Sequence, residues 1–77
     1  MARTKTPANI VGPQIRELRY KMGLTQEKLA ARCQLKGLDI SRGTLSQIEA
    51  RLRCVRDTEL LLLAAVLGVG VDELYPK

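Results

Sequence analysis

Apolar and polar positions follow the clearest helical pattern between residues 40 and 50, in the stretch ISRGTLSQIEA. Three apolar residues recur at i, i+3 and i+7, the period of one buried helical face: Leu45, Ile48 and Leu52. Ser41 precedes this stripe and is a favourable N-cap, because its hydroxyl can accept from a free backbone N–H. With Arg42 on its flank, the opposite side carries short or polar residues: Gly43, Ser46, Gln47 and Ala50. Such a helix can lie against a flat, negatively charged surface with hydrogen-bonding edges.

A first helix is predicted from Asn9, its expected N-cap, to about Met22. Pro13 falls in the first turn, where a missing N–H costs little, and Gly23 is the expected stop. The expected buried stripe is Val11, Ile15, Leu18 and Met22. Arg19 lies about 70° from the centre of this stripe, which predicts a half-buried side chain.

A second helix is predicted from Gln26 to about Gln34, with Thr25 as its N-cap. Its expected buried residues are Leu29, Ala30 and Cys33. Gln26 lies in the first turn, where helix termini favour anions. Its amide is therefore either a candidate phosphate contact or a solvated polar group. Residues 34–39, which contain Gly37, predict the turn into the central helix.

Two further helices are predicted after a basic loop at residues 51–56. The loop's apolar side chains are expected to point inward: Leu52, Cys54 and Val55. Asp57 is the expected cap of a helix over residues 58–67, which is apolar nearly all round and so expected to be buried on more than one side. Gly68 ends it. A last short helix is expected near residues 70–74, with Val71 and Leu74 packing inward.

Charge is divided unevenly along the chain, whose net charge is +5. Residues 1–56 hold twelve Lys and Arg and four acids, a balance of +8, whereas residues 57–77 hold one Lys and four acids, a balance of −3. A polyanion such as a nucleic acid is the natural partner of the basic part. On charge alone, a solvated basic surface is an equal alternative.

The predicted fold is therefore all-α, with five short helices in one domain over residues 9–77. The absence of Phe and Trp means that the core must be built from Leu, Ile, Val and Ala, which favours packed helices. Residues 1–8 have no apolar pattern and predict a flexible basic arm carrying Arg3 and Lys5. Such an arm could lie along DNA or be only a disordered terminus.

Several classes of protein are excluded by residue usage. Cys33 and Cys54 lie far apart in a chain without His, whereas zinc needs about four N or S ligands. The thiols predict a reduced, cytoplasmic protein. No signal peptide opens the chain, and its longest uncharged run, residues 60–71, is shorter than the roughly 20 residues that span a membrane. Without His, paired acids or a complete phosphate loop, we expect no catalytic residues, cofactor, metal or small-molecule effector site.

Three segments, taken in order, resemble the lambda-repressor/Cro (XRE-type) helix-turn-helix family. They are residues 24–30 (LTQEKLA), residues 40–49 (ISRGTLSQIE), and residues 60–69 with the later Asp72-Glu73-Leu74. The resemblance covers about residues 9–75, almost the whole chain. It implies a five-helix DNA-binding domain that usually acts as a homodimer on a palindromic operator, in bacterial and phage transcriptional regulators such as repressors.

The resemblance also implies roles for single residues. The family's base-reading positions fall on Arg42, Gly43, Ser46 and Gln47, in agreement with the outward face described above. Arg can bond guanine and Gln can bond adenine, each contributing about 1–3 kcal/mol of discrimination. Phosphate-contact positions fall on Gln26 and Thr44. A structural pair that joins the first helix to the recognition helix falls on Arg19 and Glu49.

Two features depart from the family pattern. The turn before the recognition helix is about five residues longer than the usual short turn, so either the second helix gains a turn or a loop protrudes. Lys36 would then be a candidate phosphate contact. Arg51 stands where the family often has Gly; a positive φ there would cost roughly 1 kcal/mol, unless the helix continues to Leu52. Arg51 and Arg53 are candidate phosphate contacts or solvated side chains.

Two functions remain open. The first is a sequence-specific regulator of double-stranded DNA, dimeric through the helix over residues 58–67 and the C-terminal segment. The expected seam consists of Leu61, Leu62, Val66 and Tyr75. The alternative is a protein-interaction module, such as the antitoxin partner of a small toxin, with the same apolar surplus and the acidic C-terminal part as its interface.

Overall fold

A computed structural model describes residues 7–76, so Arg3 and Lys5 of the predicted arm lie outside the described residues. The elements in order are α1 (Gly12–Lys21), α2 (Gln26–Leu35), α3 (Arg42–Glu49), α4 (Asp57–Leu67) and the 3₁₀ helix η1 (Val71–Leu74). No strand occurs among residues 7–76. The all-α prediction is confirmed, with the correction that the fifth helix is a short 3₁₀ helix.

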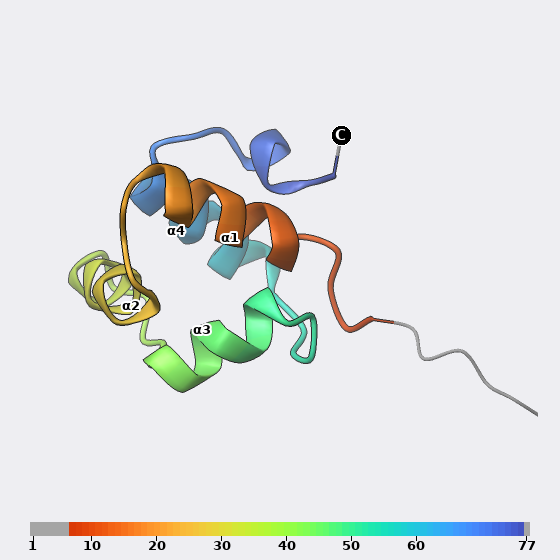
Figure 1. The fold of residues 1–77 in the computed structure, drawn as a ribbon, viewed down its shortest axis with the longest axis horizontal. Helices are drawn as coiled ribbons and strands as arrows, with labels where there is room; N and C mark the ends of the chain where they lie inside the picture. The colour runs from red at the N-terminus through yellow and green to blue at the C-terminus, as the bar shows by residue number, and fades with distance from the viewer. Residues whose placement is uncertain (1–6, 77) are drawn as a thin grey trace, which may run out of the picture.

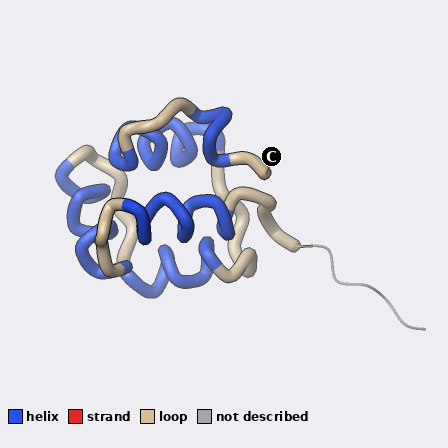
Figure 2. The backbone as a smooth tube through the Cα atoms, turned by 45° about the horizontal axis from the view of Figure 1, so that its top comes forward, coloured by secondary structure: helices blue, strands red, loops and turns tan. Residues whose placement is uncertain are grey.

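The helices surround one small core (Figure 1). In this view α1 crosses the front of the molecule, α4 lies behind it, α3 lies below, and α2 is seen nearly end-on. Contacts join α3 to both α1 and α2, α2 to α4, and η1 to α1 and α4. Figure 2 shows that loops of modest length connect these elements. Two helices, α1 and α2, thus pack against the inner side of α3.

Aliphatic side chains from every helix fill the core, as the composition predicts. The large apolar residues that are fully buried are Ile15, Leu29, Leu45, Ile48, Leu63 and Leu74. Because each α-helix presents its apolar stripe to the same interior, burial of this surface stabilises the arrangement of all five elements together. The apolar stripe of α3 therefore faces inward at Leu45 and Ile48, and Glu49 is buried beside it.

The predicted stops and caps of the helices are largely confirmed. Thr25 Oγ1 accepts from the backbone N–H of Lys28 at 3.1 Å, and Ser41 Oγ accepts from that of Thr44 at 3.1 Å. Gly23 and Gly68 have φ of 69° and 72° and terminate α1 and α4. A residue with a side chain adopts this left-handed region only with strain, which explains glycine at both ends.

Two helix starts differ from the prediction. α1 begins at Gly12, and Asn9 stands three residues earlier, where its Oδ1 accepts from the Gly12 backbone N–H at 2.8 Å. α4 begins at Asp57 rather than after it. The preceding Arg56 is the N-cap residue and donates its backbone N–H to Glu59 Oε1 at 2.9 Å, while Asp57 Oδ1 accepts from the adjacent Thr58 N–H at 2.7 Å.

Three side chains that were expected inside lie at the surface: Met22, Leu52 and Cys54. Met22 follows the last residue of α1, where the helical period no longer applies. Leu52 is 74% exposed, because α3 ends at Glu49 and the chain reverses at Arg51, whose φ is 64°. The same reversal moves Cys54 outward, and of the three predicted loop contacts only Val55 packs against the core.

The lengthened turn before α3 forms a loop rather than an extra helical turn. α2 ends at Leu35, and Gly37 has a φ of 88°. Leu38 and Ile40 are both buried and hold the loop against the core, and Gln34 Nε2 donates to the Ile40 carbonyl at 2.9 Å. The turn is therefore fixed to the domain at several points.

Of the two alternatives for Arg51, the structure has the positive φ, and this predicts a stabilising substitution. Replacing Arg51 with Gly should raise the free energy of unfolding by about 1 kcal/mol relative to Arg51→Ala, which removes the side chain but keeps the strain. Thermal unfolding of the two variants should differ by about 4–8 °C. Equal melting temperatures would show that the left-handed turn carries no strain.

Candidate nucleic-acid interface

The outward face of α3 brings together the four residues predicted to read bases. Arg42, Gly43 and Gln47 are exposed and Ser46 is half-buried, while Leu45 and Ile48 on the other side are completely buried. A helical wheel places the four residues within an arc of about 140°. The predicted face thus exists as a contiguous polar surface, about one helix wide and two turns long.

Side chains at the N-terminal end of α3 form hydrogen bonds with each other and with the backbone of the helix. Besides the Ser41 cap, Ser41 Oγ and Thr44 Oγ1 lie 3.1 Å apart and share a hydrogen bond. Thr44 is half-buried, and its hydroxyl is partly engaged by this exposed hydrogen bond with Ser41. A phosphate contact by Thr44 remains a prediction, with this hydroxyl able to accept from Ser41 and donate outward.

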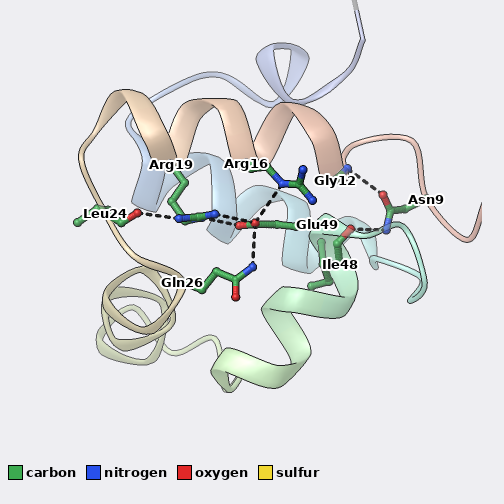
Figure 3. A network of polar contacts seen from close by, with 8 residues as sticks. All are labelled: Asn9, Gly12, Arg16, Arg19, Leu24, Gln26, Ile48 and Glu49. Atoms are coloured by element: carbon green, nitrogen blue, oxygen red, sulfur yellow. Dashed lines mark hydrogen bonds and ion pairs between the residues drawn. The ribbon is translucent and has the colours of Figure 1, made fainter.

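Glu49 holds the C-terminal end of α3 against α1 (Figure 3). Arg19 donates from Nε to Oε2 at 2.7 Å and from Nη2 to Oε1 at 2.9 Å, and both residues are buried. The hydrogen bonds to Glu49 raise the pKa of the Arg19 guanidinium, although desolvation opposes them. Arg19 Nη1 also donates to the Leu24 carbonyl at 2.8 Å. The predicted structural pair is present and more buried than the helix geometry suggested.

Gln26 belongs to the same network. Its Nε2 donates to Glu49 Oε1 at 3.0 Å, so the amide expected to be free is partly engaged within the domain. One N–H of this amide is left for a phosphate, because a primary amide has two. α1, α2 and α3 thus meet at one buried carboxylate.

Asn9 supplies a contact that the sequence did not reveal. Its Nδ2 donates to the carbonyls of Ile48 at 3.1 Å and Arg53 at 2.7 Å, while its Oδ1 caps α1. One side chain therefore joins the start of α1 to the end of α3 and the following loop (Figure 3). An Asn ahead of a helix signals a cap, but contacts 39 and 44 residues away leave no local pattern.

Of the remaining phosphate candidates, Lys36 and Arg51 are exposed and Arg53 is not free. Arg53 donates from Nη1 and Nη2 to the two oxygens of Glu59, both at 3.1 Å, and from Nη1 to the Cys54 carbonyl at 3.0 Å. These hydrogen bonds lower the pKa of the Glu59 carboxyl and raise that of Arg53. Arg53 is thus engaged in an ion pair at the start of α4, and a phosphate contact by its guanidinium remains a prediction.

Other kinds of site have little support in the described part of the chain. Cys33 is completely buried, and burial raises the pKa of its thiol to about 11, so it stays protonated at neutral pH. Cys54 is exposed. Among residues 7–76, no group of three or more His, Cys, Asp or Glu is placed to hold a metal ion. No helix of this part is long and apolar enough to cross a membrane.

A helix supported by a second helix across a turn, with its polar face outward, defines a DNA-binding module of the helix-turn-helix class. The comparison with family models agrees: the model described as Helix-turn-helix matches residues 15–74. The chain belongs to this family, whose members are DNA-binding domains and not enzymes.

Among solved structures, the fold is similar to that of a hypothetical transcription factor, NHTF, from Neisseria. The TM-score is 0.76 at 23% sequence identity, over 99% of this chain and 85% of that one. At this identity the likeness shows a shared fold. The search of curated proteins gave no match.

Proposed function

We propose that this protein is a transcriptional regulator that binds double-stranded DNA sequence-specifically and represses from a palindromic operator. The observation that carries the proposal is the exposed polar face of α3, fixed on a helix whose opposite face is completely buried. A helix of this width fits the major groove, where each base pair presents a distinct pattern of donors and acceptors.

The four residues of this face offer complementary chemistry. Arg42 can donate two hydrogen bonds to guanine, Gln47 can pair with adenine, and Ser46 can donate or accept. Gly43 has no positive φ, and a Cβ built on it would meet only Ser41 Oγ at 3.7 Å. Since folding does not require glycine there, we assign its lack of a side chain to close approach of the backbone to the DNA.

Phosphate contacts would fix the register of the protein on the duplex. We propose Lys36 on the lengthened turn, Arg51 after α3, and Gln26 and Thr44 at the ends of α2 and α3. Lys36 and Arg51 are both exposed basic side chains near the ends of the recognition helix. Arg53 follows as a further candidate whose guanidinium already pairs with Glu59.

A homodimer would place two such faces on successive major grooves, about 34 Å apart. Leu61 and Tyr75 are exposed, at 61% and 39%, and support the predicted seam over α4 and the C-terminal segment. Val66 is only 9% exposed and packs in the core, so we remove it from the seam. Leu62 is half-buried and lies at the edge of this surface.

Selection of bound duplexes from a random library tests the proposal, followed by binding of the selected site to Arg42→Ala and Gln47→Ala. Each variant should lose about 1–3 kcal/mol of preference, or about 5- to 150-fold, at particular base pairs only. Lys21→Ala removes a charge at the exposed end of α1 and serves as the control that keeps the preference. Failure to enrich any sequence, together with a tight protein partner, would replace the regulator by the antitoxin-like interaction module.

A further inference from the structure

Three side chains from two helices converge on the carboxylate of Glu49 (Figure 3). Arg19 donates hydrogen bonds to both carboxylate oxygens of Glu49, and Gln26 donates to Oε1. Arg16 points to the same oxygen, but its Nε stays 3.7 Å away. Glu49 thus already accepts three hydrogen bonds from two residues, and Arg16 is an additional cation beside this carboxylate.

The charges of this cluster do not cancel. Arg19 and Glu49 are both buried and neutralise each other, which leaves Arg16 as a net positive charge. The Arg16 side chain is 48% exposed, and among residues 7–76 it makes no hydrogen bond. A guanidinium has five N–H donors in a planar fork that fits the oxygens of a phosphate. Among residues 7–76 this guanidinium is engaged only by the 3.7 Å ion pair with Glu49.

The cluster borders the face that reads DNA. On the helical wheel of α3, Glu49 lies about 20° from Arg42 and about 60° from Ser46. Arg16 from α1 and Gln26 from the start of α2 approach Glu49 from outside α3 (Figure 3). A groove occupied by the outer face of α3 would therefore have one bordering phosphate strand beside Arg16 and Gln26.

We propose that Arg16 binds a backbone phosphate at this edge of the groove, with Gln26 as its neighbour. This assignment rests on the proposed DNA-binding function and adds α1 to the contact surface. The alternative role of Arg16 is a weak partner of Glu49 within the domain. The two roles predict different salt dependences of DNA binding.

The test measures the affinity of the wild type, Arg16→Ala and Lys21→Ala for the selected duplex between 50 and 200 mM salt. A lost phosphate contact should reduce the slope of log K against log salt by about 0.9 per bound protomer. The affinity of Arg16→Ala should then fall about 3.5-fold less than that of the wild type over this range, per protomer. Lys21→Ala is matched in charge and in helix, and should keep the wild-type slope. Arg16→Lys should keep it as well.

Two further readouts separate a phosphate contact from other effects. Arg16→Ala should weaken binding to all sequences equally and leave the base preference unchanged. Its melting temperature should match that of Lys21→Ala, because the half-exposed pair with Glu49 contributes little. A slope equal to the wild type's, or a loss confined to particular base pairs, would overturn the assignment. If the wild type itself binds no duplex, the proposed function fails instead.

Discussion

Replacement of Glu49 with alanine should lower the free energy of unfolding by about 3–5 kcal/mol. Arg19 is only 6% exposed and would be left in the interior without its counter-ion. Gln26 would also lose its acceptor. Among residues 7–76, every buried side-chain nitrogen and oxygen now has a partner, so this single change creates the unsatisfied groups that the native fold avoids. Urea unfolding monitored by circular dichroism measures the loss.

A double variant distinguishes the cost of the unpaired charge from the contribution of the pair. Arg19→Met combined with Glu49→Leu removes both charges and refills the space, and should be much less destabilised than Glu49→Ala. Glu49→Gln should lie between the two, since its amide oxygen can still accept a hydrogen bond from Arg19 while its NH2 cannot. If Glu49→Ala and the double variant unfold at the same urea concentration, the buried charge is not the source of the loss.

Replacement of Gly12 with alanine is expected to have the second-largest effect on folding. An added Cβ would overlap the Ile48 carbonyl oxygen and lie 2.9 Å from that of Glu49. Both atoms belong to the backbone of α3, so relief requires α1 and α3 to move apart. Overpacking of this kind costs about 1–3 kcal/mol, and we expect the upper end because no flexible side chain can yield.

The matched control is Gly43→Ala, the same change in the first turn of another helix. Its Cβ would meet no atom closer than 3.7 Å, so its free energy of unfolding should stay the same or rise slightly. Thermal unfolding of both variants isolates the α1–α3 contact from helix propensity. Equal stability of the two would mean that α1 moves away without cost. The Gly43 variant should also bind its selected DNA more weakly, since its methyl group would stand at the groove.

Local chemistry explains which parts of this fold could be read from the sequence. The period of Leu45 and Ile48 fixed the buried side of α3, and short hydroxyl residues correctly marked the starts of α2 and α3. These features depend on residues within one or two turns of each other. The outward face of α3 followed from the same arithmetic, and the resemblance added the roles of its residues.

The errors occurred where the chain leaves a helix. Leu52 fits the period of α3, but the left-handed turn at Arg51 directs it outward, and no period can anticipate that turn. The pairing of Arg53 with Glu59 crosses an irregular loop and was missed for the same reason. The one sequence signal for this ion pair was Glu59, an acidic residue in the first turn of α4.

Contacts between segments far apart in the chain were the least predictable part of the interface. Asn9 could be recognised as a cap but not as a ligand of the Ile48 and Arg53 carbonyls. Arg16 likewise carried no local signal of its neighbours in the fold. Its position beside Glu49 depends on how α1 crosses α3, and helix crossing is set by packing of the whole core.

Fixing α3 at both ends has a consequence for recognition. Buried Leu38 and Ile40 precede it, and Glu49 and the Asn9–Ile48 hydrogen bond secure its far end. A helix held in this way is preorganised and loses little conformational freedom when it enters a groove. In the proposed complex, α3 would then not tilt to suit a poor site, and the duplex would have to bend or twist instead. The stiffness of base steps that no side chain touches would then contribute to the choice of operator.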